Sequence, residues 1–234
     1  MTMANDFAMR GIDISEWQGA IDWKKVASDG VEFVMIRATH GKKTDVYFER
    51  NIKGALENNI VVGVYCCSYA TTVDGVKAEA EYFLKTIEPY KNDILFPAAF
   101  DAEQDKQYKL GKAKVTELIL TFCKAVEEAG YTPVNYTNCS WLNNVIDKPK
   151  VEAAGIDTWV SWPKSVKRFE QCPVDGVTKH PHTMWQFSCV GKIDGINGDV
   201  DLNVCYEAYD NKGYITISEA ADLFSKMGYK GITF

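Results

Sequence analysis

Four acidic residues next to predicted strand ends could do chemistry together: Asp13, Asp101, Glu103 and Asp201. Asp101 and Glu103 are two residues apart, and side chains at that spacing in a strand point to the same face, roughly 6.5–7 Å apart. Two carboxylates at such a separation, with their pKa values pushed apart, can hydrolyse a glycosidic bond. The apolar run at residues 94–100 predicts a buried strand that delivers both carboxylates to its C-terminal end.

Helices alternate with the strands that must position these acids. A helical stretch followed by an apolar run recurs at Gly30, Asn59, Gly130 and Gly155. Gly and Asn tolerate the left-handed conformation that closes a helix, and near-continuous apolar strands are typical of burial on both faces. The alternation therefore predicts a parallel sheet of about eight strands, the number in a closed α/β barrel. The other predicted strands lie near residues 10–14, 94–101, 183–187 and 199–203.

The final third of the chain departs from this alternation. Helical periodicity fades between residues 163 and 181, and the glycine-rich segment 191–198 predicts a hairpin between the last two strands. We therefore expect the barrel to end in strands without regular crossover helices. Active groups in such barrels gather at the C-terminal ends of strands, where we expect all four acids.

Four motifs, in order over roughly residues 9–210, resemble those of the glycoside hydrolase family 25 lysozymes. The resemblance implies a modified TIM-like β/α barrel, with five βα units followed by strands that lack helices. It also implies an N-acetylmuramidase, which cleaves the β-1,4 bond between N-acetylmuramic acid and N-acetylglucosamine in peptidoglycan, as phage and bacterial endolysins do. The motifs are residues 11–19 (GIDISEWQG) with 21–23 (IDW), the Asp101-x-Glu103 pair, residues 185–188 (WQFS) and residues 195–203 (GINGDVDLN).

The resemblance further implies a role for each acid. Glu103 matches the general acid/base and Asp101 its partner carboxylate, while Asp13 and Asp201 match acids that line the same cleft. Glu103 must then hold a proton near neutral pH, which burial beside other carboxylates favours, while Asp101 stays ionised. Whether Asp101 attacks the anomeric carbon or orients the substrate's N-acetyl group stays open. For Asp13 and Asp201, capping or turn bonding is the alternative.

Aromatic residues near strand ends are candidates for stacking on sugar rings. Burial in the core is an equally good interpretation, because large aromatic side chains often fill barrels. The candidates are Tyr65, Tyr136, Trp162 and Trp185.

Composition excludes several partners and cofactors. A net charge of −6 argues against nucleic acid, and no apolar run of about 18 residues could insert into a membrane. The three histidines and seven cysteines lack metal-site spacing, so we expect no metal, no cofactor and mostly buried, reduced cysteines. The predicted partner is bacterial peptidoglycan. Oligomeric state stays open.

The length of the chain and its terminal segments predict its domain organisation and localisation. We expect residues 1–210 to form the catalytic barrel and 211–234 a tail with one short helix, either packed on the barrel or beginning a truncated wall-binding module. Residues 1–7 lack the features of a signal peptide. We therefore expect synthesis in the cytoplasm and access to the cell wall through holin-type release or lysis.

Two other function classes compete with the muramidase. A catalytically weak barrel that only binds wall glycans is one, and the presence of all four acids counts against it. A metal-dependent polysaccharide deacetylase is the other, and it needs histidine ligands for which this chain has too few candidates.

Overall fold

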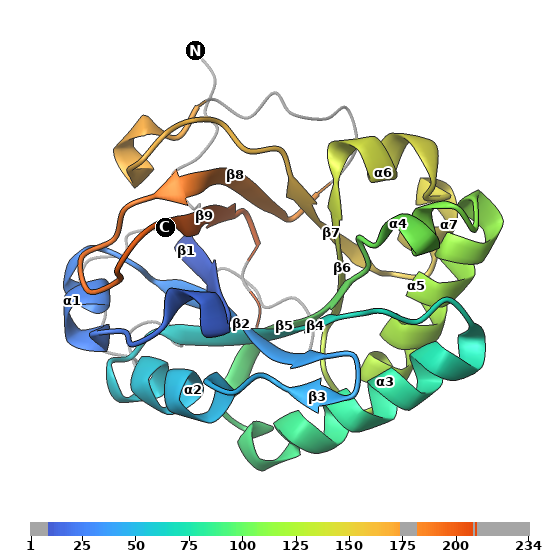
Figure 1. The fold of residues 1–234 in the computed structure, drawn as a ribbon, viewed down its shortest axis with the longest axis horizontal. Helices are drawn as coiled ribbons and strands as arrows, with labels where there is room; N and C mark the ends of the chain where they lie inside the picture. The colour runs from blue at the N-terminus through green and yellow to red at the C-terminus, as the bar shows by residue number, and fades with distance from the viewer. Residues whose placement is uncertain (1–8, 174–181, 208, 210–234) are drawn as a thin grey trace.

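A computed structural model describes residues 9–173, 182–207 and 209. They form one nine-stranded sheet that closes into a barrel, because β1 pairs with both β2 and β9, and helices surround the strands (Figure 1). The ring runs β1-β2-β4-β5-β6-β7-β8-β9, so the predicted eight-strand barrel is confirmed. The strands are β1 (Met9–Ile14), β2 (Phe33–His40), β3 (Lys43–Thr44), β4 (Val61–Cys67), β5 (Ile94–Asp101), β6 (Pro133–Asn138), β7 (Asp157–Ser161), β8 (Met184–Gly191) and β9 (Val200–Cys205).

Five strand–helix units come first, as expected. Helices follow β1, β2 with its short partner β3, β4, β5 and β6, whereas only the three-residue η3 lies between β7 and β8 in the described part of the chain. All four predicted helix-closing residues have left-handed backbone, with φ between 57° and 86°. The helices are η1 (Glu16–Gln18), α1 (Trp23–Ser28), α2 (Phe48–Glu57), α3 (Val73–Ile87), η2 (Glu88–Tyr90), α4 (Asp105–Tyr108), α5 (Lys112–Glu128), α6 (Cys139–Asn144), α7 (Lys148–Ala153) and η3 (Phe169–Gln171).

The last strand runs against the others. Strands β1 to β8 of the ring are parallel, but β9 is antiparallel to both neighbours, β8 and β1. The prediction of a hairpin at residues 191–198 is thus confirmed, and that of a parallel sheet holds for every ring strand except β9. The physical reason is connection length, since a short hairpin cannot carry the chain back to start a parallel strand.

Apolar side chains fill much of the barrel interior. Alternate residues of β2 separate into an interior cluster, which holds Phe33 and Met35, and an outer cluster beneath the helices, which holds Val34 and Ile36. Gly11 leaves room for the interior cluster, because a Cβ there would lie 2.3 Å from the Phe33 ring. A cavity lies at the end of the barrel where the parallel strands finish.

Two expectations concern segments outside the described residues. They are the helix predicted within 211–234 and the lack of signal-peptide features at 1–7. Among the helices that the structure describes, none combines the length and the apolar character that a bilayer crossing requires.

Candidate active site

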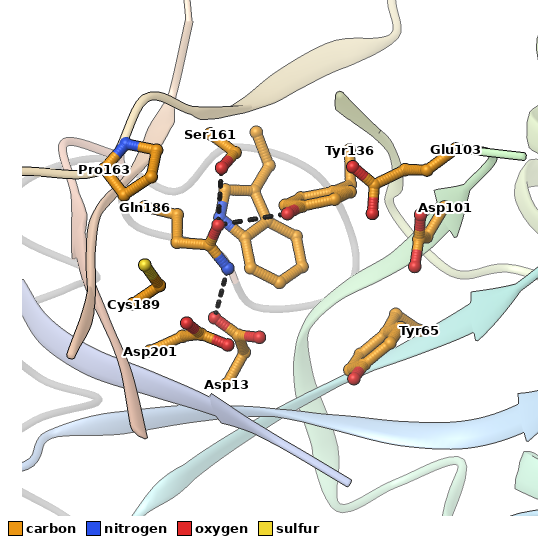
Figure 2. Close-up of a pocket in the computed structure, with 11 residues that line it drawn as sticks. Asp13, Tyr65, Asp101, Glu103, Tyr136, Ser161, Pro163, Gln186, Cys189 and Asp201 are labelled. Atoms are coloured by element: carbon orange, nitrogen blue, oxygen red, sulfur yellow. Dashed lines mark hydrogen bonds between the residues drawn. The ribbon is translucent and has the colours of Figure 1, made fainter. Parts of the chain in front are cut away.

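All four predicted acids line one cavity of about 320 Å³ (Figure 2). Asp13 comes from β1, Asp101 is the last residue of β5, and Glu103 follows in the loop beyond that strand. We expected Asp201 at the C-terminal end of its strand, but it is the second residue of β9. It still reaches the cavity, because β9 is antiparallel and pairs Asp201 with Asp13.

Asp13 is held by two amide side chains. Its Oδ2 atom accepts hydrogen bonds from Gln186 Nε2 at 2.9 Å and from Asn203 Nδ2 at 2.8 Å. The indole N–H of Trp159 donates to Asn203 Oδ1 at 2.8 Å, and Tyr136 donates to Gln186 Oε1 at 3.0 Å. An indole nitrogen can only donate, so the Asn203 oxygen must face Trp159 and its NH₂ group must face Asp13. The network therefore presents Asp13 with donors, which favour its ionised form.

Asp201 lies beside Asp13 and is suited to hold a proton. Burial raises the pKa of Asp201 first, and the negative charge of Asp13 adds to this, bringing the value to about 8. Burial also raises the pKa of Asp13, but hydrogen bonds from Asn203, Gln186 and Asp201 act against it. The hydrogen bonds to Asp13 and the burial of Asp201 together favour the proton on Asp201 and the negative charge on Asp13.

Asp101 and Glu103 form the second carboxyl pair. Asp101 is 7% exposed, and burial, followed by the charge of Glu103, raises its pKa well above the usual value. Glu103 lies at the solvent-exposed mouth of the cavity; partial burial raises its pKa, while hydrogen bonds with Asn138 and Asp101 lower it. Burial therefore favours the proton of this pair on Asp101 in the free protein, the reverse of our expectation. In addition, Asp101 Oδ1 is buried without a hydrogen-bond partner in the described protein.

The four aromatic candidates divide into three environments. Tyr65 and Tyr136 line the cavity and pack edge-on against Trp159. Trp162 follows β7 and is not among the residues that line the cavity; it is 39% exposed, with the Lys164 ammonium 3.5 Å from its ring centre. Trp185 is 1% exposed and does not line the cavity, so its core interpretation applies.

Sequence reasoning missed several cavity residues. Trp159 and Ser161 of β7 form part of the cavity wall. Gln186 of β8 also lines the cavity and stands in the sequence between the buried Trp185 and Phe187. Gln186 stands within a motif that we recognised, so its polar side chain between two large apolar residues was a usable signal. Cys189 lines the same cavity and is exposed, which contradicts burial for this cysteine.

The loop that carries Glu103 is tied to a neighbouring loop by Gln107, a fully buried residue of α4. Its Oε1 accepts from the backbone N–H of Gln104 at 2.9 Å. Its Nε2 donates to the carbonyls of Ser68 at 3.2 Å and Ala70 at 2.9 Å. The backbone next to Glu103 is thereby fixed to the end of β4.

The described residues contain no group of three or more His, Cys, Asp or Glu side chains placed to bind a metal ion. The arrangement can instead hold and move protons and present negative charge. Both are the requirements of carboxylate general acid/base chemistry.

Comparison with known proteins identifies the family. The model of "Glycosyl hydrolases family 25" matches residues 12–196, and the chain belongs to this family of glycoside hydrolases. It is 32% identical over 205 residues to the uncharacterized protein YegX of Escherichia coli O157:H7, covering 85% of this chain and 70% of that one. It is 30% identical over 208 residues to lysozyme M1 of Streptomyces globisporus, covering 86% and 68%. The modular autolysin LytC of Streptococcus pneumoniae has a similar structure, with a TM-score of 0.71, 25% identity, and coverage of 87% of this chain and 48% of that one.

Proposed function

We propose that this protein is a lysozyme that hydrolyses peptidoglycan, cutting the β-1,4 bond between N-acetylmuramic acid and N-acetylglucosamine. One observation carries the proposal: Asp13, Asp101, Glu103 and Asp201, drawn from three strands and a loop, line a single cavity in a family 25 barrel. Lysozyme M1, a relative, supports the substrate class. The substrate partner is bacterial peptidoglycan, and the place of action is the cell wall.

Glu103 is assigned as the general acid and base. It lies at the cavity mouth, where a leaving sugar and an incoming water can both reach it. Because Glu103 and Asp101 share a proton, transfer of that proton to Glu103 produces the acid and ionises Asp101 in one step. Glu103 protonates the glycosidic oxygen and then accepts a proton from water.

Asp101 is assigned to the positive charge that develops at the anomeric carbon. Its Oδ1 atom is buried and lacks a protein hydrogen-bond partner, so a substrate group can take that position. Both routes stay open: direct attack on the anomeric carbon, or orientation of the N-acetyl group. Gln186 and Asn203 favour the ionised form of Asp13, and the charge of Asp13 raises the pKa values of both Asp101 and Glu103.

A division of the chain into two parts belongs to the same proposal. Residues 1–210 form the catalytic unit, and the segment 211–234 is an addition to it. A glycan-binding barrel without activity is disfavoured, because four neighbouring carboxyls with raised pKa values are typical of acid/base sites and are not needed to bind a glycan.

The test is digestion of purified peptidoglycan, reduction of the products and mass analysis of the reduced ends. A muramidase leaves every new reducing end on N-acetylmuramic acid. Glu103→Gln should lose about 10²–10⁴-fold in rate, because an amide cannot donate the required proton. Asp105→Asn, an exposed carboxylate two residues further along, is the matched control and should stay active. New ends on N-acetylglucosamine, release of acetate without chain cleavage, or a Glu103→Gln loss below about tenfold would each contradict the proposal.

A further inference from the structure

Exposed large hydrophobic side chains gather at one end of the molecule. The described residues include five of them, and each follows the end of a strand in the chain. Trp17 comes after β1, Tyr69 after β4, Tyr108 after β5 and Trp162 after β7. Since the carboxyl ends of parallel strands share one end of the barrel, these four aromatic residues lie at the same end as the acidic cavity, although none of them lines it. The fifth is Val46, after β3.

Trp17 is the most exposed of these side chains, at 80%. Within the described chain its ring has no aromatic or cationic partner, unlike Trp162, which Lys164 covers. An indole of this size left in water is unfavourable by the hydrophobic effect, and Trp17 is one of four exposed aromatic side chains that follow barrel strands rather than an isolated case.

The backbone that carries Trp17 is held rigidly. Ser15 and Gln18 form a capping box around η1, in which Ser15 Oγ accepts from the Trp17 N–H. The backbone N–H of Glu16 donates to Asp45 Oδ2 at 2.9 Å, and the buried Arg37 donates to Glu16 Oε1 and Asp45 Oδ2, each at 2.8 Å. An exposed aromatic ring on a fixed turn loses little conformational entropy when it binds a ligand.

The position of Trp17 points to a polymeric ligand. It lies in η1, directly after β1, and follows the cavity residue Asp13 by four positions. The cavity, about 320 Å³, is at the lower end of the range for pockets that enclose small ligands, about 300–1,000 Å³. A glycan strand that enters it must continue over the rim.

We propose that Trp17 binds a sugar unit of the glycan strand outside the cavity, by stacking its indole on the apolar C–H face of that sugar. The inference rests on the proposed function, because it takes the substrate to be a glycan polymer. Trp17 contributes binding of long strands and leaves bond cleavage to the acids. A large, rigid aromatic surface with few rotatable bonds is suited to this role.

The kinetic test compares substrates of different length. Trp17→Ala should raise the half-saturating concentration of polymeric peptidoglycan by about fivefold or more with kcat unchanged, as loss of uniform binding does. Cleavage of a soluble tetrasaccharide fragment should keep the wild-type kcat/KM, and Trp17→Phe should recover most of the polymer binding. Val46→Ala, which trims a neighbouring exposed apolar side chain without removing a ring, should match wild type.

A binding test separates this inference from the proposed function. Glu103→Gln protein should sediment with insoluble peptidoglycan, and the double variant with Trp17→Ala should sediment about fivefold more weakly. A barrel that binds the wall without cleaving it would defeat the proposed function but leave this comparison intact. Equal sedimentation of the two proteins, or equal losses on polymer and tetrasaccharide, would overturn the assignment of Trp17.

Discussion

The protonation of Asp201 is the sharpest test of the electrostatics of the site. Its pKa of about 8 follows from burial and from the charge of Asp13. At pH 6, only about one molecule in a hundred then carries an ionised Asp201. Asp201→Asn therefore leaves the net charge of the site almost unchanged at that pH, and the amide keeps an N–H donor for Asp13. We expect kcat/KM of this variant at pH 6 to stay within about threefold of wild type.

The two proteins should diverge at alkaline pH. At about pH 9, roughly one wild-type molecule in ten still holds the Asp201 proton. Ionised Asp201 places a second negative charge beside Asp13, which the asparagine variant never acquires. The ratio of variant to wild-type kcat/KM should accordingly rise by up to about tenfold between pH 6 and pH 9. Taking the ratio removes the part of the pH dependence that both proteins share.

Asp13→Asn is the matched comparison. It removes the charge that Gln186 and Asn203 stabilise and that raises the pKa of both Asp101 and Glu103. The alkaline limb of its kcat/KM profile should move to lower pH.

The assay is the initial clearing rate of a peptidoglycan suspension at constant ionic strength, for wild type and both asparagine variants. If Asp201→Asn is as damaging as Asp13→Asn at pH 6, Asp201 is ionised there and the reasoning is refuted. A variant-to-wild-type ratio that stays constant up to about pH 9 refutes it equally.

Three further predictions concern stability, positioning and metal independence. The pKa of Asp201 is higher in the folded than in the unfolded protein, so the folded protein binds more protons between about pH 4 and pH 8. The free energy of unfolding should therefore fall as pH rises through that window. Urea midpoints should show this fall, less steeply in Asp201→Asn, and equal slopes for the two proteins would count against the prediction. Gln107→Leu removes the hydrogen bonds that fix the loop after Glu103, and it should lower the free energy of unfolding by about 1–3 kcal/mol. The same variant should change kcat more than it changes KM. Lys109→Leu, at an exposed residue of the same segment, should alter neither stability nor kinetics. Activity should survive dialysis against a chelator, because the assigned roles use proton transfer and charge; loss of activity that one divalent ion restores would contradict this.

Local signals in the sequence determined most of the architecture. Helix-closing residues such as Gly30 and Asn59 act within one turn, and apolar runs identify buried strands, so the alternation and the number of barrel strands could be predicted. The glycine-rich composition of the segment at 191–198, another local signal, indicated the terminal hairpin. The positions of the acids beside strands, together with the family motifs, were sufficient to nominate the four cavity acids.

Only the tertiary structure decided how those residues meet. Asp201 reaches Asp13 because β9 runs antiparallel, and Trp159 rather than Trp185 faces the cavity because of the direction in which each strand turns its side chains. Burial sets which carboxyl of a pair holds the proton, and the donors on Asp13 come from residues more than 170 positions away in the chain. Secondary structure follows from interactions between near neighbours, whereas pKa values and cavity walls depend on groups that only the closed barrel brings together.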